Sequence, residues 1–238
     1  MTVARVADNQ WHAIEDDLVV GRGFASRRLD GRTFLSIDTW RTAVFDRLAA
    51  AMLVDQPGPR YTVVDEAERD LTASWERAGF VVWRREIEYV VPTDLPQTEP
   101  PRGVSITGDA EVEQLRELDR AIRAEVEATV GWHTMPAEVL SQRSPVDPAN
   151  YTVAVRDGRY VGLVRVATRT RRPRIGLIAV LAAEQRRGIG RALLGRVLGD
   201  LRQAGTVEVT AEVDESNTAG TALFSGARRT GRSLELRA

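Results

Sequence analysis

The sequence predicts a mixed α/β fold arranged as two consecutive domains. Short β-rich runs alternate with helical patterns, a proline-rich stretch divides the chain, and the order of elements after that stretch is faintly repeated before it. Four of the ten prolines fall within residues 91–101, "VPTDLPQTEPP", a composition typical of a stiff linker. We therefore expect a first domain over residues 1–93, a linker over 94–101 and a second domain over 102–238.

The elements of the second segment follow one another clearly. Residues 103–109 predict a strand, and residues 110–130 place apolar side chains at the spacing of one helix face. Two β-rich runs surround Asp157-Gly158, which is a strong hairpin signal. The apolar run "RIGLIAV" suits a strand at the centre of a sheet. The remaining predicted elements are a helix over 191–205, a strand over 207–213 and a last strand over 233–237.

The first segment repeats this order with weaker signals. Its counterparts of the hairpin, the central strand, the helix and the next strand are residues 13–21, 30–38, 45–53 and 60–65. Between Asp38 and Phe45 the sequence reads "TWRTAV", without glycine. A backbone lacking glycine there is not expected to close around a phosphate. The first domain is therefore predicted to be degenerate, without a phosphate loop.

Composition excludes several classes of protein. The chain has no cysteine, and its two histidines lie far apart, so we expect no metal site. All 33 basic residues are arginine, and the missing lysine excludes Schiff-base chemistry and a Walker loop. A net charge of −1 argues against a nucleic-acid partner. No apolar run suits a membrane span or a signal peptide, so a cytoplasmic location without a membrane partner is expected.

The stretch "QRRGIGRALL" (185–194) stands where the central strand passes into a helix. Arg186, Arg187 and Arg191 crowd the start of that helix, which already carries partial positive charge from the aligned peptide dipoles. Cations at this end of a helix are destabilising unless an anion joins them. The arginines therefore indicate a bound anion.

Two glycines in this stretch favour the same interpretation. Gly188 and Gly190 have no Cβ, so backbone amides can approach a ligand closely and join the free N–H groups of the first helical turn. A solvated surface turn remains an alternative. A dinucleotide-binding turn would need glycine where Leu193 stands. A pyrophosphate-binding loop of another kind fits the pattern better.

Together these residues resemble the acetyl-CoA motif of the GNAT superfamily of N-acetyltransferases, written Q/R-x-x-G-x-G/A. The matching positions are Gln185, Gly188 and Gly190, followed downstream by Val213 with Asn217 and Leu223 with Phe224. The resemblance covers residues 103–238 well and 10–93 weakly. It implies two tandem GNAT-like domains, each with a central, mixed, mostly antiparallel sheet flanked by helices.

The resemblance also implies how acetyl-CoA binds as cosubstrate. The central strand and the strand after helix 191–205 separate, the pantetheine arm pairs with the exposed strand edge, and the pyrophosphate lies on the amides of the glycine loop. The residues that this implies in acetyl-CoA binding are Ile178, Ala179, Val180, Gln185, Arg186, Arg187, Gly188, Ile189, Gly190, Arg191 and Asn217.

The catalytic groups are less evident in the sequence. The family's oxyanion donor corresponds to a backbone amide near Val180. Phe224 stands where the family has a tyrosine that protonates the leaving thiolate, so either water or another group serves, or catalysis is weak. The phenyl ring is expected to pack against the pantetheine. The candidates for a general base, each of which could instead be a solvated surface group, are Glu125, Glu127, His133 and Glu212.

We therefore expect acetyl transfer to the amine of a small molecule by direct attack in a ternary complex, with one acetyl-CoA per chain. The chain is expected to act as a monomer or a homodimer. One alternative is a CoA-binding module with weak or no turnover that acts as a sensor or scaffold. Another is a protein acetyltransferase.

Overall fold

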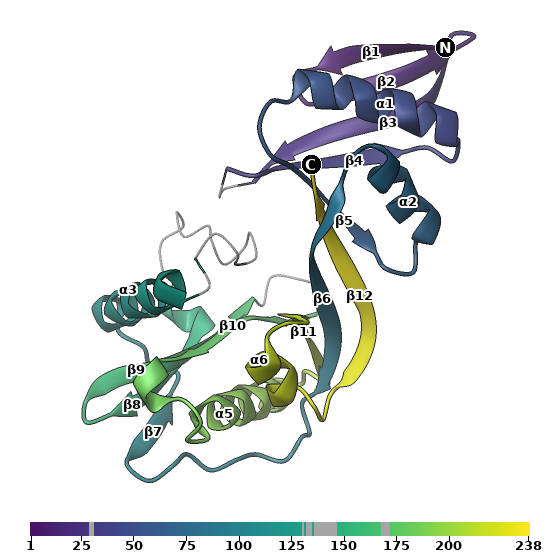
Figure 1. Ribbon diagram of the computed structural model, residues 1–238. Coiled ribbons are helices and arrows are strands. Elements are labelled where there is room, and N and C mark those ends of the chain that lie inside the picture. The colour runs from purple at the N-terminus through teal and green to yellow at the C-terminus, as the bar shows by residue number, and fades with distance from the viewer. Residues whose placement is uncertain (29–30, 130, 132–134, 136–146, 168–171) are drawn as a thin grey trace. The chain divides into compact units, whose positions relative to one another are not determined.

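The computed structural model describes residues 1–238 except 29–30, 130, 132–134, 136–146 and 168–171 (Figure 1). The described chain forms two compact units. The first comprises Met1–Ile87 together with Asp214–Ser216 and Gly231–Ala238, and the second comprises Glu88–Val213 together with Asn217–Thr230. The first break therefore falls between Ile87 and Glu88, ahead of the expected linker at residues 94–101, and the C-terminal residues Gly231–Ala238 are counted with the first unit.

The first unit contains a mostly antiparallel sheet in the order β1-β2-β3-β4-β5-β12-β6. Its parallel pair is β4 with β5, and this ladder joins Thr33 to Arg60 and Phe34 to Tyr61. The strands are β1 (Thr2–Ala7), β2 (Gln10–Glu15), β3 (Leu18–Arg27), β4 (Thr33–Asp38), β5 (Arg60–Asp65), β6 (Val81–Pro92) and β12 (Arg228–Arg237), and the helices are α1 (Thr42–Asp55) and α2 (Arg69–Arg77).

One face of this sheet is packed against both helices of the unit. Gly23 on β3 lets α1 approach closely, because a Cβ there would lie 2.4 Å from the sulfur of Met52. Phe45 of α1 meets Trp75 of α2 edge to face, with ring centroids 4.9 Å apart. Leu234 and Leu236 of β12 belong to the same buried cluster, so the core of the first unit depends on residues from the far end of the sequence.

The second unit has the sheet order β12-β6-β11-β10-β9-β8-β7. Helices α3 and α5 cover opposite faces of this sheet (Figure 1). The elements are β7 (Val104–Thr107), α3 (Val112–Thr129), β8 (Tyr151–Arg156), β9 (Arg159–Ala167), β10 (Arg174–Val180), α5 (Ile189–Gln203), β11 (Glu208–Asp214) and α6 (Thr218–Leu223), with single 3-10 turns at Pro148–Asn150 and Ala182–Glu184. The predicted fold class, a mixed α/β chain with a mostly antiparallel sheet flanked by helices, is confirmed.

The proline-rich stretch contains no helix or strand between Thr93 and Gly103, and part of it packs against α5. A Cβ at Gly195 would lie 3.2 Å from the backbone nitrogen of Thr98, and one at Gly199 would lie 2.1 Å from Nε2 of Gln97. The two glycines stand one helical turn apart and therefore leave a shallow path on α5 that this segment follows. Residues 97–98 thus form part of the packed second unit.

Candidate functional site

Strands β10 and β11 separate shortly after they meet. Their parallel ladder joins Arg174 to Thr210 and Ile175 to Ala211, and in the described chain it extends no further. Strand β10 continues to Val180 with its other edge paired to β9. Residues 176–180 are only half-buried although all five are apolar or glycine. The structure therefore leaves a strand edge and apolar side chains open beside the separating strands.

A β-bulge marks the point of separation. The register between β10 and β9 shifts between Ile175 and Leu177, which leaves Gly176 in the bulge. An added Cβ at position 176 would be in ordinary contact with the guanidinium of Arg165, whose nitrogens would lie 3.4 and 3.5 Å away. Arg165 follows Leu163 on the sheet face that packs against α3. A cation therefore lies on that face beside the bulge.

The glycine loop adopts the conformation expected of an anion-binding helix start. Gly188 is the N-cap of α5 with a φ of 87°, a left-handed conformation that favours glycine. Gly190 has no heavy atom within 4 Å of an added Cβ, so space is open on that side of the loop. Arg186 also has a positive φ of 62°, a strained conformation of the kind that occurs at functional sites. The first N–H groups of α5 lack intrahelical partners, as at any helix N-terminus.

The side chains of the loop divide between solvent and core. Ile189 is 1% exposed, so it can offer a ligand only its backbone. Arg187 forms an ion pair with Glu184 at 3.3 Å, whereas Arg186 and Arg191 extend into solvent. Three arginines therefore surround the start of α5, with one nearby carboxylate to offset them. This imbalance suits a multiply charged anion.

Two side chains tie the end of β10 to its surroundings. Gln185 donates from Nε2 to the carbonyl oxygen of Val180 at 2.9 Å, which links the loop to the last residue of the strand. Glu125 of α3 accepts the backbone N–H of Ala182 at 3.0 Å. The motif glutamine and the candidate base Glu125 thus both lie at the turn between β10 and α5.

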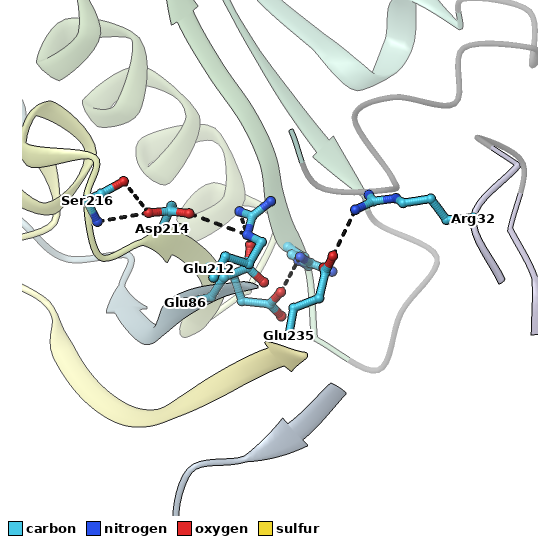
Figure 2. A network of polar contacts seen from close by, with 8 residues as sticks. Arg32, Glu86, Glu212, Asp214, Ser216 and Glu235 are labelled. Atoms are coloured by element: carbon cyan, nitrogen blue, oxygen red, sulfur yellow. Dashed lines mark hydrogen bonds and ion pairs between the residues drawn. The ribbon is translucent and has the colours of Figure 1, made fainter. Parts of the chain in front are cut away.

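The other predicted residues have different surroundings. Asn217 is the N-cap of α6, and its side-chain oxygen accepts the N–H of Gly220 at 2.9 Å. Glu212, labelled in Figure 2, forms an ion pair with Arg174 at 2.6 Å. Glu127 is exposed on the last turns of α3. His133 lies outside the described residues. Within the described chain no group of three possible metal ligands occurs.

Phe224, which replaces the tyrosine of the family motif, is buried and does not line open space. It is 5% exposed, and its ring stacks on that of Tyr89 with centroids 5.5 Å apart and planes at 29°. Tyr89 comes from β6, on the other side of β11 from the open strand edge. Sequence reasoning missed this tyrosine, because nothing in its own segment marks it.

A second charged cluster, also missed from the sequence, lies in the first unit. Asp214 accepts both the N–H and the hydroxyl of Ser216 and pairs with Arg84, which also pairs with Glu86 (Figure 2). Beside it is an open hollow of about 390 Å³, whose lining includes Trp83. The residues that line this hollow carry charges of both signs, so we interpret the cluster as a structural network of the first unit.

Residues 113–227 match the family model described as the acetyltransferase (GNAT) family. The matched segment contains α3, the separating strands and the glycine loop. Residues 113–227 are a GNAT acetyltransferase domain. The resemblance indicated by the sequence motif is therefore confirmed for the part of the chain that carries the motif, and the enzyme class is that of an acyltransferase.

Solved structures with similar folds extend the likeness to both units. A GCN5-related N-acetyltransferase from Sphaerobacter thermophilus is 19% identical, with 99% of this chain and 82% of that chain covered and a TM-score of 0.71. A tandem GNAT protein from the clavulanic acid biosynthesis pathway is 13% identical, with 96% and 82% covered and a TM-score of 0.65. A GCN5-related N-acetyltransferase from Kribbella flavida is 18% identical, with 92% and 86% covered and a TM-score of 0.62.

At these identities the likeness shows the fold, which is that of a tandem GNAT protein. No curated protein matches the chain in sequence. None of the described helices is both long and apolar enough to span a membrane.

Proposed function

We propose that the second unit binds acetyl-CoA and transfers its acetyl group to the amine of a small molecule in a ternary complex. The observation that carries this proposal is the early separation of β10 and β11 beside a glycine loop. The open backbone edge of residues 176–180 can pair with an amide-containing chain, as a strand edge does. The amides and arginines at the start of α5 suit a pyrophosphate.

The residues present fit this cosubstrate on two counts. Gly190 leaves open space where a side chain would obstruct a phosphate, and Gly188 holds the left-handed conformation that turns the backbone into α5. Acetyl-CoA supplies a thioester, whose carbonyl carbon the acceptor amine attacks. In that step a C–N bond forms, the C–S bond breaks, and a backbone amide near Val180 stabilises the developing oxyanion.

Among the candidate bases, we propose Glu125 rather than Glu212. The carboxylate of Glu212 is already engaged by the guanidinium of Arg174 at 2.6 Å. Among the residues that the structure describes, one oxygen of Glu125 accepts the backbone N–H of Ala182 and the other accepts no hydrogen bond, so it can receive a proton from an acceptor amine. We therefore propose Glu125 as the group that takes up this proton, directly or through water.

The acceptor is proposed to be a polar amine. Arg165, Arg174 and Glu212 are grouped on the sheet face that packs against α3, beside the bulge at Gly176. Such a concentration of charge next to a reactive carbonyl suits a hydrophilic acceptor better than an apolar one. A cytoplasmic location and action as a monomer or homodimer remain part of the proposal.

The decisive experiment measures thiol release from acetyl-CoA with a panel of amines that includes amino acids, polyamines, amino sugars and a lysine peptide. Release with a small amine, lost in Glu125→Gln and kept in Glu212→Gln, is the expected result. Binding of acetyl-CoA without release for any acceptor would identify a sensor or scaffold. Release with the peptide alone would identify a protein acetyltransferase.

A further inference from the structure

Helix α5 begins without the side chain that usually stabilises a helix start. Its N-cap is Gly188, which has no side chain to accept an N–H group of the first turn. Arg186, two residues earlier, has a positive φ, and a strained backbone of this kind persists only where neighbouring structure holds it. Inside the helix, Gly190, Gly195 and Gly199 lower its intrinsic stability further. The start of α5 therefore needs support from outside the helix.

Residues 93–101 form a strap that reaches both ends of α5. At one end Thr93 is 5% exposed, and its hydroxyl donates at 2.7 Å to the carbonyl oxygen of Thr206, just beyond the last turn of the helix. At the other end the Cγ of Pro101 would lie 3.9 Å from a Cβ added at Gly188, the distance of an ordinary van der Waals contact. The ring of Pro101 therefore lies close beside the helix start.

Between its two ends the strap follows one face of α5. Gly188, Gly195 and Gly199 share that face, because they are separated by seven and four residues. The missing side chains of Gly195 and Gly199 leave room for Thr98 and Gln97 of the strap. Helix α5 has 15 residues and is about 22 Å long. An extended chain covers about 25 Å between the two ends of the strap, so the strap runs antiparallel along the whole helix.

We propose that the strap holds the start of α5 in the conformation that binds acetyl-CoA, with Pro101 as a positioning residue. This inference rests on the proposed binding of acetyl-CoA by the second unit. The amides that bind the pyrophosphate belong to the first turn of α5, so they point to one place only while that turn is formed. The measured affinity falls in proportion to the fraction of molecules in which it is formed. The strap therefore acts on cosubstrate affinity and not on the chemical step.

The first test displaces the strap from the helix with Gly195→Leu. The new side chain meets the backbone of Thr98, whereas leucine favours the helical conformation more than glycine does, so α5 keeps its own propensity. The Kd for acetyl-CoA, measured by titration calorimetry, should rise about tenfold, as expected when the formed fraction falls to a tenth. At saturating acetyl-CoA, kcat should stay unchanged. Arg196→Leu, which places the same side chain at an exposed position of α5, is the matched control and should leave Kd unchanged.

The second test removes a single contact of the strap with Pro101→Gly. Without the ring beside Gly188, Kd for acetyl-CoA should rise about threefold, again with kcat unchanged at saturation. Pro100→Gly adds the same backbone freedom at the exposed neighbouring position, and it should leave Kd unchanged. Pro101→Val returns a branched apolar side chain to the contact and should recover most of the affinity.

A third measurement needs neither acetyl-CoA nor turnover. The N–H of Ala192 donates to the carbonyl oxygen of Gly188 at 3.1 Å and closes the first turn of α5. Hydrogen exchange at this amide should become at least about tenfold faster in Gly195→Leu and at least about threefold faster in Pro101→Gly, and stay unchanged in both controls. The N–H of Ala204, at the other end of the helix, should keep its rate in Pro101→Gly.

The possible outcomes distinguish this inference from the proposed function. Unchanged exchange at Ala192 in both variants, in a protein that binds acetyl-CoA, overturns the role of the strap alone. Faster exchange with an unchanged Kd overturns that role too, because the strap would then serve packing only. Wild-type protein that does not bind acetyl-CoA overturns the proposed function and the effect on affinity with it. Faster exchange, weaker binding and an unchanged kcat in the two variants, absent from their controls, support both.

Discussion

Two strand-to-helix junctions, β4 to α1 in the first unit and β10 to α5 in the second, share one frame and differ in how the helix begins. Each follows a strand whose parallel ladder with the next strand covers two residue pairs. In the second unit α5 starts at Gly188 with a left-handed backbone. In the first unit α1 starts at Arg41, whose backbone is extended, with a φ of −107°. The two units therefore differ in the backbone conformation at the start of the helix and not in the sheet that precedes it.

The charge at the two junctions is also balanced differently. Arg41 pairs with Glu15 at 2.5 Å, so the first unit supplies a carboxylate of its own to the arginine at the start of α1. At the start of α5, Arg186 and Arg191 extend into solvent and Gly190 faces open space. A repeated fold thus keeps its packing, while a few residues at one helix end decide whether an external anion can bind.

The largest expected effect comes from Gly190→Asp. A carboxylate in the open space beside the loop should lower acetyl-CoA affinity by at least about 100-fold, measured by titration calorimetry, because it both fills the space and repels phosphate. The melting temperature of the apo protein should be maintained or raised, since Gly190 has no positive φ and an anion is favourable at a helix N-terminus. A variant that loses stability but keeps its affinity would show that the loop serves packing alone.

The matched control for this variant is Thr42→Asp at the first residue of α1. The same charge at the corresponding helix start should leave acetyl-CoA affinity unchanged. Calorimetry of the wild type should give one acetyl-CoA per chain. A stoichiometry of two equivalent sites would mean that the glycine-free junction at Trp40 also binds the cosubstrate, and the contrast between the units would fail.

A smaller effect is expected from Gln185→Leu. The variant removes the bond from the loop to the carbonyl of Val180, so the strand end and the loop lose their fixed relation. Loss of one hydrogen bond of this kind should weaken acetyl-CoA binding by about fivefold. Gln203→Leu at the last residue of α5 removes the same side chain away from the loop and should have no such effect. Equal acetyl-CoA affinities for the two variants would show that Gln185 does not shape the site.

The smallest effect concerns the ion pair of the first unit. The hydrogen bond from Arg41 lowers the pKa of Glu15 from its ordinary value of 4.5. A lowered carboxyl pKa adds stability above the unfolded pKa, and this stability is lost as the pH falls through the folded pKa. Glu15→Gln should therefore reduce the melting temperature at pH 7 by at most about 2 °C, and by progressively less as the pH falls below 4.5. A difference that does not shrink with falling pH or in high salt would exclude the ion pair as its cause.

Local signals in the sequence were sufficient to predict most of the helices and strands of the second unit. The glycine loop, the hairpin at Asp157-Gly158 and the strand 174–180 lie where they were predicted, because turn residues and apolar runs act over short distances. The partner of β12 could not be predicted in this way. Its pairing with β5 depends on residues far apart in sequence, and the alternation of apolar and polar residues along a strand does not identify the strand that it pairs with.

The residues of the candidate site were predictable from the sequence only to the same extent. Gln185 and Gly188 are recognisable from their spacing, whereas the stacking of Phe224 on Tyr89 joins two elements that are far apart in sequence. The pairing of Glu212 with Arg174 likewise joins two strands, and only the structure shows that this carboxylate is already engaged. Motif residues are predictable when they act through one continuous segment, and the groups that support them from neighbouring strands are not.

Because β12 completes the first unit, the order in which the chain is synthesised affects when that unit can be completed. Arg32 pairs with Glu235 across 203 residues, and Leu234 and Leu236 complete the core of the first unit. A ribosome adding about 5–20 residues per second releases residues 231–238 only after the whole second unit has been made. One strand position in the sheet of the first unit therefore stays unfilled until the second unit has been synthesised.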